Sequence, residues 1–399
     1  MKILVLNSGS SSIKFKLFDN KIVLASGLVE KIGNNQSKIE LKNAKTGTKM
    51  RRDTHIGNHE KGLQLVEELF NESGILKDLN ELDGCGHRIV HGGKNLTEHC
   101  LVNDFVLEEI DRVSTIAPLH NPAHLAGIKT MLKAAPKVPN ATIFDTAFHK
   151  SMPDYAYMYA LPYDYYTEYN IRKYGFHGTS HSYVSSRAAI LMQKENINAI
   201  SAHLGNGASV CAIENGKSID TSMGFTPLEG LMMGTRCGDI DPATLPFIAK
   251  AKNLNADELD TMMNKQSGLY GVCGYNDFRD VVSEIQNGNN LARLALDMYC
   301  YRLAKYIGSY FAILPHTDAL IFTAGVGENA KIVRQKTCER LKHLGFELDD
   351  SLNESDESGE REISKANSKV KIFVIPTDEE LEIAKITEEL IKKDRKSVV

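Results

Sequence analysis

The chain has 399 residues, of which 42% are hydrophobic and 25% charged, and its formal net charge at pH 7 is −4. This length exceeds what one ordinary hydrophobic core can organise, so two domains are expected. The lack of a basic excess argues against binding to nucleic acid or to an anionic membrane surface. No apolar run approaches the length of a membrane span and no signal peptide precedes the first strand, so we expect a cytoplasmic protein.

The seven cysteines are scattered along the chain, at positions 85, 100, 211, 237, 273, 300 and 338. Their number is odd and none forms a CxxC pair. This pattern predicts reduced thiols rather than a disulfide framework or a zinc site.

The first nineteen residues predict a β-hairpin with a polar tip. Residues 3–6 form an apolar run typical of a buried strand, and residues 7–12 (NSGSSS) form a small, hydroxyl-rich turn. In residues 13–17 apolar side chains alternate with Lys14 and Lys16, which is the period of a second strand. A P-loop would lead into a helix here, whereas this turn leads into a strand.

The tip of this hairpin is a candidate phosphate-binding element. Glycine and serine let backbone amides and hydroxyls approach a phosphate closely. Lys14 lies just beyond the turn, where its ammonium can neutralise phosphate oxygens. The alternative is an ordinary polar turn between two strands.

Two further strands of the first half end next to charged residues, and helices are expected over residues 60–70 and 123–134. Residues 85–90 are strand-like, and Arg88 stands where this strand runs into a double glycine that a ligand can approach closely. A surface ion pair is the alternative for Arg88. Residues 141–144 form a buried strand followed by Asp145, and a carboxylate in that position commonly faces the ligand crevice of an α/β sheet. The alternative for Asp145 is a capping role.

The second half opens with a tyrosine-rich connector over residues 155–169, whose acidic neighbours argue against stacking on nucleic acid. We therefore expect the first domain to end near residue 148. A helix follows, capped by Thr179 or Ser180 and running to about residue 194. His177 lies beside its free N-terminal amides, where it can meet a phosphate.

The strand–turn–strand pattern then recurs over residues 200–204, 205–209 (GNGAS) and 210–214. Residues 216–218 (GKS) resemble the end of a Walker A motif, but Cys211 stands where the first glycine is required, so we reject a P-loop. Two such units, one in each half, are the architecture of the actin, Hsp70 and sugar-kinase group. In that group the nucleotide lies in the cleft between duplicated ribonuclease H-like domains.

Residues 225–242 are nearly all loop, and a loop this rich in glycine, methionine and charge is more often functional than a stretch of core. Arg236 is its candidate for chemistry, and the alternative is an ion pair with Asp239 or Asp241. Together, Arg88 and Arg236 can clamp a transferring phosphoryl group from two sides.

Near the C-terminus we expect a long amphipathic helix over residues 289–314, a strand over 318–322 and a glycine-rich turn at 325–330 that opens a helix to about residue 344. This turn fits a dinucleotide-binding pattern, but its late position and the two hairpins argue against one, and it would equally hold an adenosine. After a last strand at 371–375, the terminal helix is expected to cross back onto the first domain. Glu379 at its start either holds a metal or favours the helix N-terminus.

The whole chain, from residue 4 to the terminal helix, resembles the acetate kinase family. The segments that carry the resemblance are NSGSSSIK, HRIVHGG, APLHNPA, IFDTAFH, RKYGFHGTSH, HLGNGAS, DTSMGFTPLEGLMMGTRCGDIDP, FTAGVGEN and PTDEEL. The resemblance implies an α/β fold of two duplicated ribonuclease H-like domains, which we expect at residues 1–148 with 379–399 and at residues 149–378. It also implies a homodimer that converts acetate and ATP to acetyl phosphate and ADP, reversibly, with Mg²⁺, which Mn²⁺ can replace.

Roles for individual residues follow from this resemblance, position by position. Asn7 and Glu379 look like metal-site residues, and Lys14 like a phosphate contact. Arg88 looks like the contact for the substrate carboxylate, Asp145 like the active-site carboxylate, and His177 and Arg236 like transition-state stabilisers. The ATP-binding segments look like His203, Leu204, Gly205, Asn206 and Gly207, then Asp277, Phe278 and Arg279, then Gly325, Val326, Gly327, Glu328 and Asn329. The pocket for the substrate methyl group looks like Val90, Leu119, Phe176 and Pro227.

The chain departs from the family pattern at few positions. Ser8 stands where alanine is frequent, Cys237 stands where serine is frequent, and residues 271–277 are shorter and less hydrophobic than usual. These departures leave the named catalytic residues in place and bear on nucleotide preference.

The chemistry expected of such an enzyme needs no general base, because a carboxylate is already ionised at neutral pH. Asp145 is therefore expected to orient the metal or Arg88, while the cations bring two anions together for in-line transfer. Three alternatives remain: a propionate or butyrate kinase of the same family, a non-enzymatic ATPase module of the Hsp70 or actin type, and a nicotinamide oxidoreductase that rests on the Gly325 turn alone.

Overall fold

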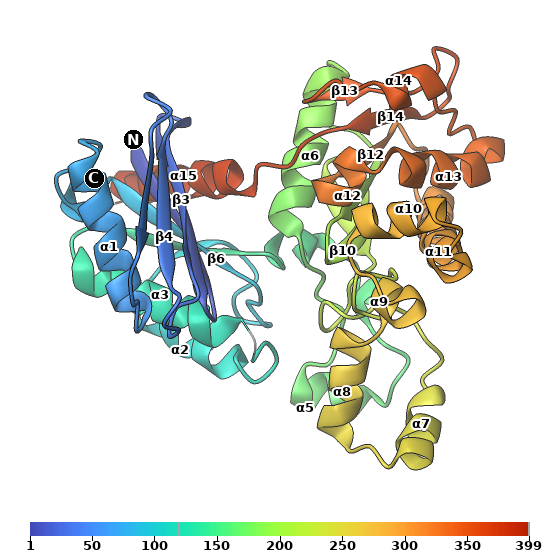
Figure 1. The fold of residues 1–399 in the computed structure, drawn as a ribbon, viewed down its shortest axis with the longest axis horizontal. Helices are drawn as coiled ribbons and strands as arrows, with labels where there is room; N and C mark the ends of the chain where they lie inside the picture. Colours follow the sequence, from blue (N-terminus) through green and yellow to red (C-terminus); the bar gives the residue numbers. More distant parts are fainter. Residues whose placement is uncertain (119, 398–399) are drawn as a thin grey trace. The chain divides into compact units, whose positions relative to one another are not determined.

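The computed structural model describes residues 1–118 and 120–397, and these divide into two compact units. The first consists of Met1–Ala147 together with the chain from Asp378 onward, and the second consists of Phe148–Thr377. Each unit is an α/β structure built on a mixed sheet (Figure 1). The predicted fold class is confirmed.

The sheet of the first unit has the strand order β5-β4-β3-β2-β1-β6-β8-β7. Strands β1, β6 and β8 run parallel to one another, and the remaining neighbours are antiparallel. The bounds are β1 Lys2–Gly9, β2 Ser12–Asp19, β3 Ile22–Glu30, β4 Lys38–Asn43, β5 Lys49–Asp53, β6 Gly84–Ile89, β7 Cys100–Leu101 and β8 Asn140–Phe144.

Helices cover both faces of this sheet. On one face α1 (His59–Glu72) and α3 (Asn121–Ala134) pack against alternate residues of β1 and β2, such as Leu4 and Phe15, while α2 (Asp104–Val113) packs beside α3. On the other face α15 (Glu379–Ser397) buries Ile383 and Ile391 against Ile3 and Val5. The terminal helix therefore belongs to the first unit (Figure 1).

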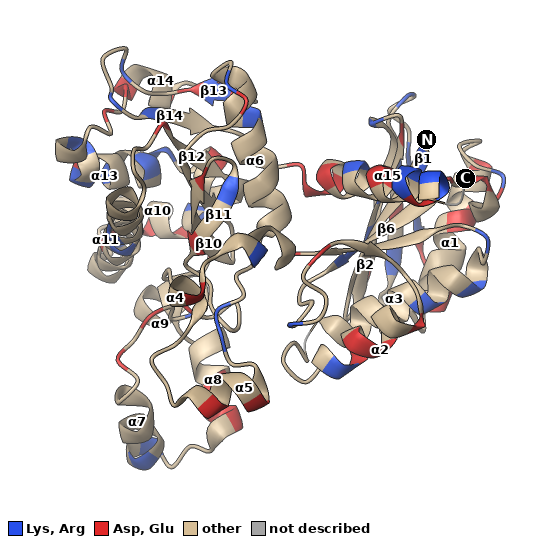
Figure 2. Cartoon of the chain, turned by 180° about the vertical axis from the view of Figure 1, so that it is seen from behind, with Lys and Arg blue, Asp and Glu red and all other residues tan. Residues whose placement is uncertain are grey.

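The sheet of the second unit has the order β11-β10-β9-β12-β14-β13. Its strands lie between α6 and α11 (Figures 1 and 2). The strand bounds are β9 Ala199–Leu204, β10 Ala208–Glu214, β11 Lys217–Thr221, β12 Ala319–Thr323, β13 Arg361–Glu362 and β14 Lys371–Val374. The helices are α4 Asp154–Tyr157, α5 Tyr163–Tyr169, α6 Gly178–Leu191, α7 Thr244–Lys252, α8 Ala256–Lys265, α9 Gly268–Cys273, α10 Phe278–Gln286, α11 Asn290–Ile313, α12 Ala324–Asn329, α13 Lys331–Leu341 and α14 Asp350–Glu354.

The two sheets repeat the same strand plan. In the first unit β3, β2 and β1 form an antiparallel meander. Strand β1 then pairs in parallel with β6, and β6 pairs in parallel with β8. In the second unit β11-β10-β9 form the equivalent meander, followed by β12 and β14 in parallel. Each half thus places its hairpin beside a parallel strand whose carboxyl end is open to a ligand.

Both hairpin turns are shorter than the sequence predicted. Asn7 pairs with Lys14 and Gly9 with Ser12, so only residues 10 and 11 form the first turn. In the second hairpin, β10 already begins at Ala208. The prediction was wrong because asparagine and serine are poor strand formers on their own, whereas in the first hairpin pairing with β2 satisfies their backbone groups.

Two helix predictions also need correction. Helix α6 begins at Gly178 after His177, which has a left-handed backbone (φ 56°) and makes no side-chain capping bond, so neither Thr179 nor Ser180 is the cap. The glycine-rich segment predicted as a turn is itself a short helix, α12, and the helix expected after it is α13, which is separated from α12 at Ala330.

All seven cysteines are free, as predicted. Within residues 1–118 and 120–397, no helix has the length and apolar character needed to cross a bilayer.

A buried histidine gives the first unit a specific acid sensitivity. The His87 imidazole is 2% exposed and its Nε2 lies 2.7 Å from Asn140 Oδ1, and burial lowers its pKa to about 4. In the unfolded chain this pKa is about 6.5, so below that pH the unfolded state binds more protons and stability falls toward pH 4, by up to about 3 kcal/mol. We expect His87→Gln to reduce the drop in melting temperature between pH 7.5 and pH 5. His343→Gln, at an exposed histidine, should leave that drop unchanged, and equal drops in all three proteins would contradict the assignment.

Candidate functional site

In the first unit, Arg88 and Asp145 meet at the carboxyl edge of two parallel strands. Arg88 lies opposite Ile143 in the pairing of β6 with β8, and Asp145 follows the end of β8. Arg88 Nε donates to Asp145 Oδ1 at 3.0 Å, and Nη2 donates to Oδ2 at 2.8 Å. The side chain of Asp145 is 3% exposed. Arg88 is therefore not in a surface ion pair, and the bidentate geometry fixes the plane of its guanidinium.

Glu379 joins this pair from the first residue of α15. Its Oε2 lies 3.5 Å from Arg88 Nη2. Burial opposes the charge on Arg88, but the nearby carboxylates of Asp145 and Glu379 outweigh burial, so the pKa of Arg88 is raised. The cluster carries two negative charges and one positive charge, a composition that suits a cation together with an anionic substrate.

Asp378 and Lys16 fix the start of α15, and sequence reasoning missed both. Lys16 Nζ donates to Asp378 Oδ1 at 3.0 Å, and the same oxygen accepts from the Leu381 amide at 3.1 Å. Asp378 thus caps the helix and ties it to β2. The first turn of α15 is acidic and its last turn basic, the order that the helix dipole favours (Figure 2). The polar alternation in residues 13–17 was the available signal for Lys16.

Asn7 and Lys14 are paired across the first hairpin, next to this edge. Asn7 follows Leu6, which lies opposite His87 in the parallel pairing of β1 with β6. Asn7 is half-buried and Lys14 is exposed. Val90, half-buried, follows directly after β6.

Asn7 and Glu379, the residues predicted for the metal, offer an amide oxygen and a carboxylate. Amide and carboxylate oxygens are the ligands Mg²⁺ prefers, and it usually retains waters and substrate phosphates rather than sit in an all-protein cage. Among the described residues no group of three or more His, Cys, Asp and Glu side chains is arranged to hold a metal. The donor set therefore suits a metal that arrives with a nucleotide.

Two buried polar side chains of the first unit lack a partner among the described residues, Ser8 in the predicted phosphate-binding turn and His124, which sequence reasoning missed. Ser8 Oγ and both ring nitrogens of His124 have no hydrogen-bond partner within the part of the chain that is described. Burial and the charge of Arg88 lower the pKa of His124 to about 3, so its ring is neutral at physiological pH. These groups add hydrogen-bonding capacity beside the arginine.

In the second unit, Arg236 is a cation with no acidic partner among the described residues. Its Nη1 donates to the carbonyl of Pro227 at 3.1 Å, and no carboxylate of residues 1–118 or 120–397 is recorded in an ion pair with it. Burial lowers the pKa of Arg236. The alternative of an ion pair between Arg236 and Asp239 is wrong. Asp239 instead accepts hydrogen bonds from Tyr306 Oη at 2.6 Å and from the Gly230 amide at 2.8 Å. A half-buried guanidinium of this kind is suited to bind an anion.

Neighbouring helices hold the loop that carries Arg236. Residues 225–242 contain no helix or strand, as predicted. Arg302 on α11 donates to the carbonyl of Gly230 at 3.0 Å, and the Leu269 amide of α9 donates to the carbonyl of Met233 at 2.9 Å. This anchoring reduces the freedom of the loop before a ligand binds.

His177 and Arg236 both face Gly207, in the turn of the second hairpin. A Cβ at Gly207 would lie 3.2 Å from Arg236 Nη1 and 3.8 Å from the His177 Nε2 atom. His203 stacks on His177 with ring centroids 4.0 Å apart. Two side chains assigned to the transition state thus converge on one backbone position.

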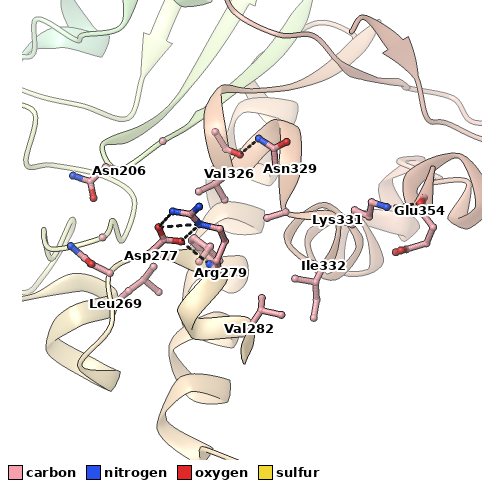
Figure 3. A pocket seen from close by; sticks show the side chains of 16 residues that line it. Asn206, Leu269, Asp277, Arg279, Val282, Val326, Asn329, Lys331, Ile332 and Glu354 are labelled. Atoms are coloured by element: carbon pink, nitrogen blue, oxygen red, sulfur yellow. Dashed lines mark hydrogen bonds and ion pairs between the residues drawn. The ribbon is translucent and has the colours of Figure 1, made fainter. Parts of the chain in front are cut away.

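A cavity of ≈ 990 Å³ lies beside this point in the second unit (Figure 3). It brings together three segments that the sequence assigned to the nucleotide, represented by Gly205 and Asn206, by Asp277, Phe278 and Arg279, and by Gly325, Val326 and Asn329. Gly325 has open space where a Cβ would lie, so the cavity reaches the backbone there.

Asp277 and Arg279 form one edge of the cavity. Arg279 Nε and Nη2 donate to the Asp277 carboxylate at 3.0 and 2.6 Å, and the Arg279 amide donates to it at 2.8 Å (Figure 3). Hydrogen bonding from Arg279 lowers the pKa of Asp277 to about 2. The guanidinium face stays exposed, where it can stack on a planar ring.

Sequence reasoning missed the apolar part of the lining. The apolar side chains that were missed are those of Val282, Ile332 and Leu269. The other lining residues that were missed are Gly234, Asn276, Ala330, Lys331 and Glu354. Val282 lies one helical turn after Phe278, and Ile332 lies in the first turn of α13. The available signal in the sequence was therefore the helical spacing of these residues from the predicted nucleotide segments.

Some predicted residues lie outside this cavity. His203 and Leu204 end β9, Gly207 faces His177 and Arg236, and Gly327 and Glu328 lie within α12. Phe176 is 2% exposed and Pro227 is half-buried, both in the second unit, whereas Val90 is in the first. Leu119 lies outside the described residues.

Comparisons with known proteins agree on one family. A model of the acetokinase family matches residues 2–385. The chain is 73% identical over 396 residues to an acetate kinase of Campylobacter jejuni subsp. jejuni, covering 99% of this chain and 100% of that protein. A crystal structure of Porphyromonas gingivalis acetate kinase superposes with a TM-score of 0.93 at 42% identity, covering 98% of this chain and 99% of that one. A Francisella tularensis propionate kinase superposes with a TM-score of 0.92, also at 42% identity and the same coverage.

Proposed function

The chain belongs to the acetokinase family and is thus a phosphotransferase with a carboxyl acceptor, and we propose that it transfers the ATP γ-phosphoryl group to acetate, reversibly and in line, in a Mg²⁺-dependent reaction. The products are acetyl phosphate and ADP. The 73% identity to an acetate kinase over nearly the full chain supports acetate as the acceptor.

In the first unit, the proposed role of Arg88 is to bind the carboxylate of acetate. Its bidentate bond to Asp145 holds the guanidinium plane, so Asp145 acts by orienting Arg88. Asn7 and Glu379 would hold Mg²⁺, which supplies charge neutralisation at the phosphate oxygens. Lys14 is assigned to phosphate, and Val90 to the methyl side of the substrate.

In the second unit, the proposed nucleotide site is the cavity edged by Asp277 and Arg279. Arg236 and His177 are assigned to the transferring phosphoryl group, since both face Gly207. An acetate oxygen attacks phosphorus, the bond to the β,γ-bridging oxygen breaks, and ADP leaves. No proton transfer is required, because the nucleophile is a carboxylate.

The observation that carries this proposal is Arg236, a partly buried arginine with no acidic partner in the described part of the chain, two residues after Gly234, which lines the cavity. Trapping of the acyl phosphate as its hydroxamate tests the proposal. With Mg²⁺, ATP and acetate we expect hydroxamate to accumulate, and with acetate omitted we expect none. ATP hydrolysis without acyl phosphate would indicate an ATPase module instead.

Propionate is the second candidate acceptor, because a solved propionate kinase is as similar in sequence and fold as a solved acetate kinase. The difference is one methylene, worth about 10- to 200-fold in a hydrophobic pocket. Comparing kcat/KM for acetate, propionate and butyrate decides between the two. We expect acetate to be preferred.

We also propose that the enzyme is a cytoplasmic homodimer. Seven free cysteines support a reducing compartment. Large apolar side chains exposed on the second unit support self-association, among them Tyr155, Tyr163, Tyr169, Phe247, Leu291 and Tyr301. Light scattering coupled to size exclusion should give a mass near twice 44.2 kDa.

A further inference from the structure

A row of alternating histidine and serine side chains runs inward from His177 within the second unit. His177 Nδ1 lies 2.8 Å from Ser209 Oγ, and the same oxygen lies 2.8 Å from His181 Nε2. On its other side His181 Nδ1 makes a hydrogen bond with Ser201 Oγ. Ser209, His181 and Ser201 are all 0% exposed.

The secondary structure explains this arrangement. His177 directly precedes α6 and His181 lies in the first turn of that helix, with the two ring centroids 6.4 Å apart. Ser209 and Ser201 come from the neighbouring antiparallel strands β10 and β9. A hydroxyl from each strand therefore contacts the rings on the helix.

The protons in this row are interdependent. Burial lowers the pKa of His181 well below its ordinary value, so its ring is neutral and carries a single N–H. Because both of its nitrogens bond hydroxyls, His181 donates on one side and accepts on the other. In one arrangement His181 donates to Ser209, and the Ser209 hydroxyl then donates to His177 Nδ1. In the other, Ser209 donates to His181 and accepts from a His177 Nδ1–H.

Either arrangement engages His177 Nδ1 and turns Nε2 toward Gly207. Phosphoryl oxygens only accept hydrogen bonds, so a bound phosphoryl group selects the states in which Nε2 carries a proton. Those states are the neutral ring that accepts from Ser209 and the doubly protonated ring that donates to it.

We propose that Ser209, held by His181, is a positioning residue that fixes the His177 ring so that its Nε2–H is directed at the transferring phosphoryl group. This inference rests on the role proposed above for His177. His177 is the N-cap residue of α6, but its backbone is left-handed and its side chain makes no capping bond to the helix. The helix therefore does not fix the orientation of the ring. Stacking on His203 restrains the plane of the ring, and Ser209 restrains its rotation within that plane.

The test is a double-mutant cycle between Ser209→Ala and His177→Ala. We expect Ser209→Ala to lower kcat about 10- to 100-fold with little change in KM for ATP or acetate, the range for a partner that orients a catalytic ring. Because Ser209 acts through His177, adding Ser209→Ala to His177→Ala should cause no further loss. Ser209→Thr, which keeps the hydroxyl, should retain most of the activity.

Ser185→Ala is the matched control, because it also removes a buried serine hydroxyl, in this case one on α6 bonded to a backbone carbonyl, without contact to His177. It should leave kcat unchanged. The proposal is overturned if Ser209→Ala keeps wild-type kcat while His177→Ala does not, or if the two losses multiply. If instead His177→Ala is fully active, the role of His177 itself fails.

A spectroscopic measurement on the wild-type enzyme keeps the proposal falsifiable even if Ser209→Ala folds poorly. The ¹⁵N shifts of the His177 ring, recorded with ADP and a phosphate analogue bound, should show a protonated Nε2. An unprotonated Nε2 in that complex would refute the assignment.

Discussion

Arg236→Ala is expected to lower kcat by about 10³-fold or more, the usual value of an arginine that stabilises a transferring phosphoryl group. The melting temperature should stay the same or rise, because the variant removes a buried charge that has no acidic partner in the described chain. KM for ATP should change little, since the nucleotide segments Asp277–Arg279 and Gly325–Asn329 are untouched. Steady-state kinetics and differential scanning calorimetry measure these effects.

Two further variants sharpen this test. Arg236→Lys keeps the charge but loses the planar fork, so we expect an intermediate kcat. Arg187→Ala removes an arginine of the same unit that pairs with Glu360, and its kcat should match the wild type. If Arg236→Ala retained a kcat within about tenfold of the wild type, the guanidinium would not act on the transition state.

The sequence predicts the placement of Asp145 because it follows a short apolar run, and strands buried on both faces end where such runs end. It predicts the placement of Arg88 because a strand-like segment runs into two glycines just after it. The ion pair between Arg88 and Asp145 can also be predicted from the sequence, because neighbouring parallel strands end at the same carboxyl edge of the sheet. The length of the first hairpin turn cannot be predicted from the sequence. Asn7 and Ser8 have low strand propensity, and only pairing with β2 makes them strand residues.

The walls of the nucleotide cavity illustrate a second limit. Val282 and Ile332 come from different helices, and no local pattern says which face of each helix will line a cavity. Likewise, the serine–histidine row depends on the register of β9 with β10 and on the left-handed backbone at His177. Motifs identify side chains that carry chemistry, whereas the residues that orient them come from distant segments and appear only in the folded chain.

Arg88→Ala is expected to affect both activity and stability. The substrate carboxylate loses its bidentate partner, so kcat/KM for acetate should fall by several orders of magnitude. Asp145, 3% exposed, then loses the guanidinium to which both of its oxygens are hydrogen-bonded, which should cost about 3–5 kcal/mol of stability. Kinetics and urea unfolding of the same preparation separate the two effects.

Arg88→Ala combined with Asp145→Asn distinguishes folding from catalysis. Neutralising Asp145 removes the unpaired buried carboxylate, so we expect the double variant to recover much of the lost stability. Its activity should stay as low as that of Arg88→Ala, because nothing replaces the guanidinium that binds acetate. Activity that returned together with stability would mean that Arg88 supports the fold alone. Loss of activity in a stable protein would instead mean that Arg88 binds the carboxylate of the substrate. Asp145 would then act by holding the plane of the Arg88 guanidinium.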